Sequence, residues 1–277
     1  MRPSTAKTTN AGLQDLTKEF LGLDNLEFFA RVLAPGDDED SRGDAIVVLI
    51  GSRDLPGDLL RRAQAILRWD LSPSHWSHGC IIDRAWNGKG KVAAVPILEV
   101  PLHPRNRHFP QPDQNGLNPG ATLGLYADPK LDANVAVLRV RRRVQEGRSL
   151  RVTALAKDTV KTLRDAASDT NRDRTRFDFW GAIATWQMYL WSNAERPNPL
   201  RQGAPIPAAA HLDAAFEAIG LDIVPGADER CSGPEHVWQA AKWWYQKGLA
   251  TPLPGDFQIE GAYVLRDRGA SRLEAAD

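Results

Sequence analysis

The sequence has little of what marks several broad classes of protein. Only two of its 277 residues are cysteines, which is too few for the disulfide framework of a small secreted domain. Its 35 basic residues balance its 35 acidic ones, so net charge gives no reason to expect nucleic acid or an anionic membrane as a partner. No apolar run reaches the length of a membrane span. We therefore expect a globular chain with no membrane span.

The beginning of the chain carries no secretory signal that we recognise. The first thirty residues lack a continuous apolar core, which a cleaved signal peptide would need. We therefore expect a protein that is cytoplasmic as made, and export as an effector by a route without a cleaved signal stays open. The length suffices for one well-packed core. We expect residues 1–42 to form a helical extension and 43–277 to form the main domain.

Hydrophobic periodicity predicts an α+β fold, with an antiparallel sheet packed against helices. Helices are expected at 13–33, 56–69, 152–167, 179–192 and 207–219, and again after residue 231. Strands are expected at 45–50, 78–83, 92–100, 134–142 and 259–266. The arginines at 139 and 141–143 are interpreted as solvated charges on an edge strand. Residues 101–133 hold six of the nineteen prolines and are expected to form a long irregular connection.

The stretch Glu229–Trp238 places a cysteine, Cys231, where a loop is about to become a helix. Pro234 suits the first helical turn, because its missing N–H would have no partner there. A thiol at a helix N-terminus lies near the positive end of the backbone dipole, which favours thiolate. The free N–H groups of that turn could also receive the oxyanion of an acyl-transfer intermediate. The alternative is a small buried cysteine at the start of a core helix.

A base that could activate this thiol is sought among six histidines. His78 opens an apolar strand, so the backbone can hold its ring in a fixed direction. Glu99 is an acid in an otherwise apolar stretch, and it is the candidate to orient that ring. His75, three residues earlier, is the alternative base if the strand register differs. Three further histidines are interpreted as surface or capping residues: His103, His108 and His211.

Several short motifs follow one another in a distinctive order. Gly43-Asp44 precedes a strand, Ser77-His78 opens the next, and Leu98-Glu99 lies on the one after. Phe177-Asp178-Phe179 and Cys231-Ser232 complete the order. Over residues 43–266 the chain thus resembles the circularly permuted, NlpC-type branch of papain-like amidases and peptidases. Its relatives include the YiiX-like hydrolases and, more distantly, the lecithin:retinol acyltransferase-like enzymes.

The resemblance implies a papain-like fold and a set of roles. Cys231 would be the nucleophile, His78 the general base and acid, and Glu99 the residue that orients His78. The backbone N–H of Cys231 would be one oxyanion donor. The expected activity is thiol-dependent hydrolysis of an amide, with a peptide or small acyl compound, such as a peptidoglycan fragment, as substrate. The same fold would also suit an acyltransferase or a lipid hydrolase.

A second motif offers a different nucleophile. The stretch Ser77-His78-Gly79-Cys80-Ile81 resembles the nucleophile motif of L,D-transpeptidases, in which Cys80 would attack and Cys231 would be structural. That family follows the motif with an arginine, where this chain has Ile82, and places a histidine upstream, whereas none precedes His75. A further alternative retains the papain-like fold as a catalytically inactive binding module.

No cofactor or metal is expected. His75, His78 and Cys80 lie close together in the sequence, and all three are residue types that bind zinc. A tetrahedral zinc site needs a fourth ligand, and the sequence offers no obvious one near them. We therefore expect a metal-free site that relies on the thiol.

Overall fold

The computed structural model describes residues 20, 22–34, 44–84, 86–106, 116–169, 178–193, 195–224 and 231–269. Some sequence-based expectations therefore fall outside the described residues. They are the helical residues 13–19, His108, and the motif residues Gly43, Phe177, Glu229 and Arg230.

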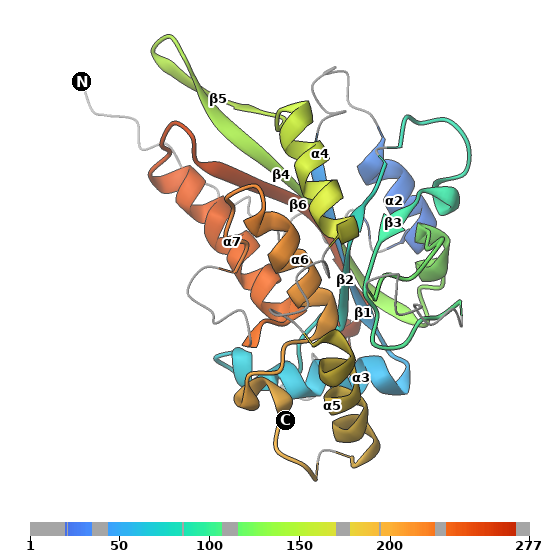
Figure 1. The fold of residues 1–277 in the computed structure, drawn as a ribbon. Coiled ribbons are helices and arrows are strands. Elements are labelled where there is room, and N and C mark those ends of the chain that lie inside the picture. Colours follow the sequence, from blue (N-terminus) through green and yellow to red (C-terminus); the bar gives the residue numbers. More distant parts are fainter. Residues whose placement is uncertain are drawn as a thin grey trace, which may run out of the picture.

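A six-stranded antiparallel sheet passes through the middle of the described chain (Figure 1). Its strands are β1 (Ala45–Ser52), β2 (His78–Ile82), β3 (Ile97–Leu98), β4 (Asp132–Glu146), β5 (Ser149–Thr153) and β6 (Phe257–Leu265). They lie in the order β3-β2-β1-β4-β5, and β6 pairs with β4. Every residue of β1 is buried, as its continuous β-branched run predicts for a central strand covered on both faces.

Six α-helices in the described residues pack around this sheet (Figure 1). They are α2 (Asn25–Leu33), α3 (Leu55–Ala63), α4 (Lys157–Asp169), α5 (Phe179–Trp191), α6 (Pro207–Glu217) and α7 (Pro234–Ala250). The α+β architecture expected from the sequence is therefore confirmed. None of the described helices is long and apolar enough to cross a membrane.

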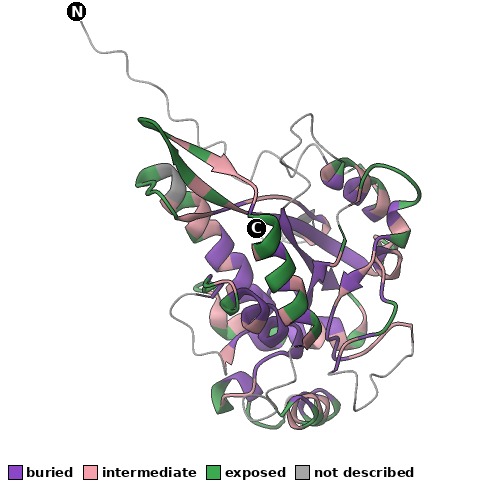
Figure 2. Ribbon diagram, turned by 45° about the horizontal axis from the view of Figure 1, so that its top comes forward, coloured by how far each residue is buried: buried purple, intermediate pink, exposed green. Residues whose placement is uncertain are grey.

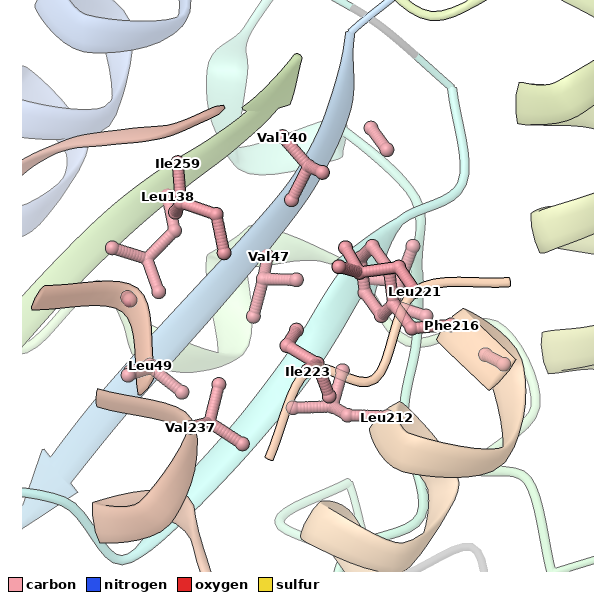
Figure 3. Packing of buried hydrophobic residues seen from close by; sticks show 14 of the residues in the cluster. Val47, Leu49, Leu138, Val140, Leu212, Phe216, Leu221, Ile223, Val237 and Ile259 are labelled. Atoms are coloured by element: carbon pink, nitrogen blue, oxygen red, sulfur yellow. The ribbon is translucent and has the colours of Figure 1, made fainter. Parts of the chain in front are cut away.

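Strand alternation divides the core between the two faces of the sheet. Val47 and Leu49 of β1 point to the face covered by α6 and α7, where they join Leu212, Phe216 and Val237 (Figure 3). The intervening residues of β1 point to the opposite face, which α2 covers. This alternation is the two-residue period of an extended strand, and it leaves most of the sheet buried (Figure 2).

Helix α2 belongs to the core on that opposite face. Phe28 and Phe29 are fully buried there, in the same cluster as Val48 and Cys80 of the sheet. The helix begins with a capping box, in which the Asp24 side chain accepts from the Glu27 N–H and the Glu27 side chain accepts from the Asp24 N–H. Residues 25–33 are thus packed against the sheet.

Two of the expected strands differ from the structure. Residues 92–100 were expected to form one strand, but they contain a 3₁₀ turn (Val92–Ala94) and only the two-residue β3. Pro96 lies between them, and a proline cannot donate to a strand ladder. Strand β5 was not expected, because it is short, partly exposed and lacks a clear apolar face.

Two of the four arginines of β4 have a different role from the one expected. At Arg139 the strand is not an edge, because β1 and β6 pair with it on its two sides, and at Arg142 its neighbours are β5 and β6. Arg142 is exposed, as expected. Arg139 and Arg141 form ion pairs with the buried carboxylate of Asp44. Asp44 immediately precedes β1, so this motif residue anchors the start of β1 to β4.

The connection at 101–133 is irregular, as expected. In its described parts before β4, the regular structure consists of one 3₁₀ helix (Leu123–Tyr126) and an isolated bridge between Pro96 and Thr122.

The burial of α2 leads to a stability prediction. Replacing Phe29 by alanine should lower the free energy of unfolding by about 3–5 kcal/mol, because it removes a fully buried ring and leaves a cavity. Trp69→Ala is the matched control, since Trp69 is 96% exposed and its loss should change stability by less than about 0.5 kcal/mol. Urea unfolding of the two variants measures both values. Equal effects would mean that α2 does not contribute to the stability of the core.

Candidate functional site

The structure brings together two of the residues singled out from the sequence. His78 is the first residue of β2, and Glu99 directly follows β3, which pairs with β2. The Nε2 atom of His78 lies 3.0 Å from Oε2 of Glu99. Both side chains are largely buried. Pairing between two adjacent strands therefore fixes the imidazole relative to the carboxylate.

Two further side chains hold the carboxylate of Glu99. Asn118 donates from Nδ2 to Oε1 at 2.6 Å, and the hydroxyl of Tyr126 donates to Oε2. Burial raises the pKa of Glu99, but the hydrogen bond and charge of His78, with the bonds from Tyr126 and Asn118, outweigh burial and leave that pKa lowered. Burial and the charge of Glu99 raise the pKa of Tyr126 well above its usual value. Glu99 is therefore ionised beside a protonated phenol.

The ionised carboxylate determines which nitrogen of the His78 ring carries a proton. A carboxylate only accepts hydrogen bonds, so the Nε2 atom of His78 must carry the proton that it shares with Glu99. In a neutral ring the other nitrogen, Nδ1, then has a free lone pair. Within the described residues Nδ1 makes no hydrogen bond. His78 is thus held in the tautomer that a general base requires.

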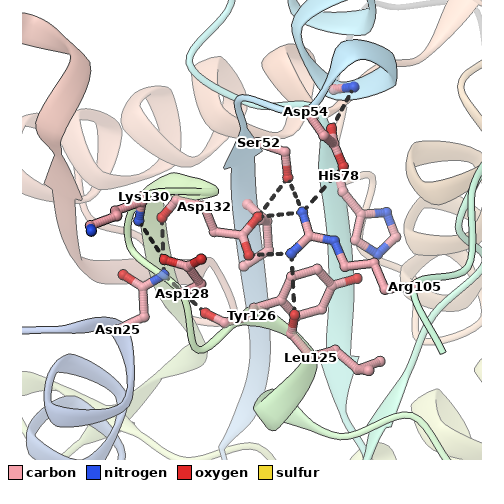
Figure 4. Close-up of polar contacts among 12 residues, drawn as sticks. Asn25, Ser52, Asp54, His78, Arg105, Leu125, Tyr126, Asp128, Lys130 and Asp132 are labelled. Atoms are coloured by element: carbon pink, nitrogen blue, oxygen red, sulfur yellow. Dashed lines mark hydrogen bonds and ion pairs between the residues drawn. The ribbon is translucent and has the colours of Figure 1, made fainter.

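A small cavity of about 50 Å³ opens beside His78. Arg105 and Tyr126 line it, together with residues at the N-terminal end of α3. The guanidinium of Arg105 lies 5.0 Å from the ring centroid of Tyr126 and forms a two-pronged ion pair with the buried Asp132 (Figure 4). Ser52 also contacts this pair, through its hydroxyl. The charge of Arg105 is therefore matched within the protein.

Cys231, the third residue singled out, has a free and partly exposed thiol. Helix α7 begins at Pro234, as the sequence predicts, with Gly233 as its N-cap. Cys231 thus lies three positions before the first helical residue. Among the described residues the thiol makes no hydrogen bond to His78. The structure therefore pairs His78 with Glu99 and does not join Cys231 to them by a hydrogen bond.

The first-turn N–H groups of α7 already have partners. The N–H of Glu235 donates to Oε1 of Gln64 at 2.9 Å, and the N–H of His236 donates to the carbonyl of Gly233. The expectation that this turn offers free N–H groups to an oxyanion is therefore wrong for these two groups. For Glu235 the cause is the buried side chain of Gln64, whose place beside α7 no sequence pattern predicts.

Gln64 docks the segment of Cys231 onto the segment of His78. Its side chain is fully buried and donates from Nε2 to the carbonyl of Trp76 at 2.8 Å. Trp76 lies two residues before His78, and the other partner of Gln64 is Glu235, four residues after Cys231. The carboxylate of Glu235 also accepts from Ser74 Oγ at 2.7 Å. The two segments are therefore held side by side by buried polar contacts.

Cys80 lies in a very different environment from Cys231. Its side chain is fully buried in the sheet core. Burial, and then the charge of Glu99, raises the pKa of the Cys80 thiol well above its usual value. Such a thiol stays neutral and is closed to solvent, which is the opposite of what a nucleophile needs. The packing therefore disfavours Cys80 as the reactive residue.

The remaining histidines lie in separate places. His211 was interpreted as a surface or capping residue, and this is wrong, because it is fully buried in α6. Its Nε2 lies 2.9 Å from the carbonyl of Ala167, and burial lowers its pKa to about 4. His75 is partly buried with its ring beside Trp76. His103 lines the small cavity together with His78.

Several residues of this site were not found from the sequence. Gln64, Arg105, Asn118 and Tyr126 belong to no motif, and three of them lie in the proline-rich connection. Only their places in the fold identify them, beside Glu99, against α7 or, for Arg105, in the lining of the small cavity. Within the described part of the chain, no group of three or more His, Cys, Asp or Glu side chains is arranged to hold a metal ion.

Comparison with protein-family models, curated proteins and solved structures finds no match to this chain. The family resemblance of the motifs therefore stays a hypothesis. The contacts described above are what bear on function.

The environment of Glu99 predicts a pH dependence of stability. Because its pKa is lowered from the usual 4.5, its carboxylate stabilises the fold above that pH, and this contribution is lost as the pH falls through the folded-state pKa. Glu99→Gln removes the titrating group. Its unfolding free energy should therefore fall less steeply than that of the natural protein below about pH 5. Urea unfolding across a pH series measures the slopes.

The exposed Glu146 supplies the control for this experiment. Glu146→Gln should leave the slope of the natural protein unchanged. If Glu99→Gln kept the full slope, the carboxylate of Glu99 would not be held ionised by its neighbours.

The docking by Gln64 predicts a second stability effect. Gln64→Met keeps the approximate size but leaves the Glu235 N–H without its partner, while the Trp76 carbonyl keeps only the bond from the Ser74 hydroxyl. At roughly 1–3 kcal/mol for a buried group left unpaired, the free energy of unfolding should fall by about 1–3 kcal/mol. The exposed Gln145, changed to methionine, is the control and should show almost no loss. Similar losses for both variants would rule out this role for Gln64.

Proposed function

We propose that the protein is a thiol-dependent hydrolase of the papain-like type, acting on an amide bond. Cys231 is the nucleophile, His78 is the general base and acid, and Glu99 orients His78. The observation that carries this proposal is the buried His78–Glu99 pair, in which Nε2 is bonded and Nδ1 is left free. Unlike the unpaired Nδ1 of the fully buried His211, Nδ1 of His78 is not shut off in the core, so solvent or a substrate can reach it.

The proposed reaction proceeds in two stages. Nδ1 of His78 takes the thiol proton of Cys231, and the thiolate attacks the substrate carbonyl carbon. When the tetrahedral intermediate collapses, the C–N bond breaks and the imidazolium gives its proton to the leaving amine. Water, with its proton taken by His78, then hydrolyses the thioester and restores the thiol. Glu99 stabilises the imidazolium that forms in each stage.

The position of Cys231 is compatible with this role. Its thiol is partly exposed, and its segment is docked against the segment of His78 through Gln64 and Glu235. Catalytic hydrogen bonds are often long in a free enzyme and form fully only when substrate is bound. In this proposal, substrate binding brings the thiol to Nδ1 of His78. The backbone N–H of Cys231 remains the expected oxyanion donor.

Two substrate classes follow from the proposal. The first is a small peptide, such as a peptidoglycan fragment, with cleavage of an amide. The second is a lipid ester or another acyl compound, with hydrolysis or acyl transfer. The second class is favoured by the apolar exposed face of α5, where Trp180 and Trp191 are 45% and 76% exposed.

The assignment of Cys231 can be tested with paired cysteine variants. Cys231→Ala should lower turnover by roughly 10³-fold or more, because no other group at the site replaces the nucleophile. Cys80→Ala is the control and should keep activity within a few fold, since Cys80 is fully buried in the core. Turnover is measured on peptide amides, muropeptides and acyl esters assayed side by side.

A chemical measurement accompanies the kinetic one. Iodoacetamide should alkylate Cys231 much faster than Cys80, as followed by mass spectrometry of the two cysteine peptides, because Cys231 is partly exposed and Cys80 is buried. His78→Ala should slow the alkylation of Cys231 if His78 draws off its proton. Full turnover by Cys231→Ala would overturn the proposed function, and loss of turnover in Cys80→Ala with an intact fold would move the nucleophile to Cys80.

A further inference from the structure

A second and larger cavity lies between α5 and the segment that leads into α6. Its volume is about 350 Å³. Its wall consists mainly of small or apolar residues, among them Gly181, Ala182, Ala204, Pro205 and Ala210. Phe179 closes part of it, and Asp178 and Thr185 are its two polar side chains. None of these residues lines the small cavity beside His78.

The polar groups of this wall are already used within the protein. Asp178 accepts at Oδ1 from the N–H of Gly181, and the hydroxyl of Thr185 donates to the carbonyl of Gly181. The N–H groups of Ala204 and Ala210 donate to backbone carbonyls. Pro205 and Pro207 have no N–H to offer. Apart from the exposed carboxylate of Asp178, the cavity therefore provides mainly small and apolar side chains and few free N–H or O–H donors for an anionic ligand.

The wall of this cavity is bonded directly to the segment of the candidate nucleophile. Ile206 lies between the two lining prolines, Pro205 and Pro207, and its N–H donates to the carbonyl of Ser232 at 3.0 Å. Ser232 is the residue after Cys231. An apolar group held in the cavity would thus lie against a segment that is hydrogen-bonded to Ser232, the residue next to Cys231.

The size of the cavity suits a group longer than a single side-chain ring. Benzene fills an apolar cavity of about 150 Å³, and this cavity has more than twice that volume. An unbranched alkyl chain of several methylenes would fill this larger volume. Each methylene that leaves water for such a site adds to the affinity, so binding should tighten as the chain lengthens.

The helix that forms one wall is also apolar on its outer side. Trp180, Ala184, Met188 and Trp191 recur at helical spacing on α5, and all four are exposed. A surface helix normally carries polar residues on its outer face. An apolar outer face on the same helix gives an alkyl chain a favourable surface to contact before it enters the cavity.

We propose that the cavity between α5 and α6 binds the alkyl chain of an acyl substrate, with the scissile carbonyl placed towards Cys231. This inference rests on the proposed function, because it names the substrate class of the same thiol. It predicts a preference for medium-length unbranched acyl groups over acetyl groups.

Binding can be tested without turnover, on the full-length Cys231→Ala variant. Octanamide, which carries the carbonyl and an eight-carbon chain, should bind at least tenfold more tightly than acetamide by isothermal titration calorimetry. Adding Ala182→Trp, which fills the cavity from α5, should weaken octanamide binding at least tenfold. Adding Ala218→Trp, at an exposed position at the C-terminal end of α6 that does not line the cavity, is the matched control and should change binding less than twofold.

A second variant that fills the cavity tests whether the effect of Ala182→Trp comes from the cavity and not from a local change in α5. Ala204→Trp fills the cavity from the opposite wall and should have the same effect, with circular dichroism and thermal unfolding used to verify that each variant is folded. Equal affinity for octanamide and acetamide, or octanamide binding that both filled variants keep, would overturn the inference.

Failure of this inference and failure of the proposed function are distinguishable. Binding is measured with the thiol absent, so chain-length selectivity can hold even if Cys231 proves not to be catalytic. Conversely, turnover of peptide amides that depends on Cys231, together with no preference for octanamide, would overturn the cavity assignment alone.

Discussion

The buried carboxylate of Glu99 is the constraint on which the rest of the site depends. A charge with almost no exposure must be met by hydrogen bonds or opposite charge, or the fold loses several kcal/mol. Here the partners come from three places: His78 on β2, Asn118 in the irregular connection, and Tyr126 in its 3₁₀ helix. Satisfying one carboxylate therefore fixes the histidine ring and also draws the proline-rich connection onto the sheet. The hydrogen bond that helps to offset the cost of burying the charge is also the one that orients the ring of His78.

A second set of buried polar contacts joins the segment before β2 to α7. Gln64 and Glu235 are both fully buried and both reach the segment at 74–76 that leads into β2. Removing either partner would leave a buried group unpaired, which makes the docking of α7 specific as well as stable. The segment of His78 is thus held from the carboxylate side by Glu99 and from the helix side by Gln64. In this arrangement the ring of His78 is held by a hydrogen bond to Glu99, whereas among the described residues no hydrogen bond joins the thiol of Cys231 to His78.

The sequence was informative where one physical pattern dominated. The apolar run of β1 and the helix start at Pro234 each have a single simple cause, and both were placed correctly. Glu99 was singled out as an isolated acid, but it follows β3 instead of lying on a strand as expected. Partners such as Gln64, Tyr126 and Arg105 could not be placed, because only the tertiary fold brings them to the site. The thiol of Cys231 lies between these cases. The sequence predicts that Cys231 lies just before a helix, but the placement of its segment beside His78 depends on contacts made through Gln64.

Helix α5 is where the local rules of folding agree least with one another. Its inner side packs into the protein through Trp186 and Leu190, which would suffice to hold it in place. Its outer side is apolar as well, and this adds nothing to the stability of the isolated fold because those side chains stay in water. Departures of this kind tend to coincide with function, since a sequence shaped for folding alone would place polar residues there. The helix also forms the wall of the larger cavity, whose other wall is bonded to Ser232. Helix α5 therefore carries both the surplus apolar surface and one wall of this cavity, and the acyl ligand proposed above would account for both.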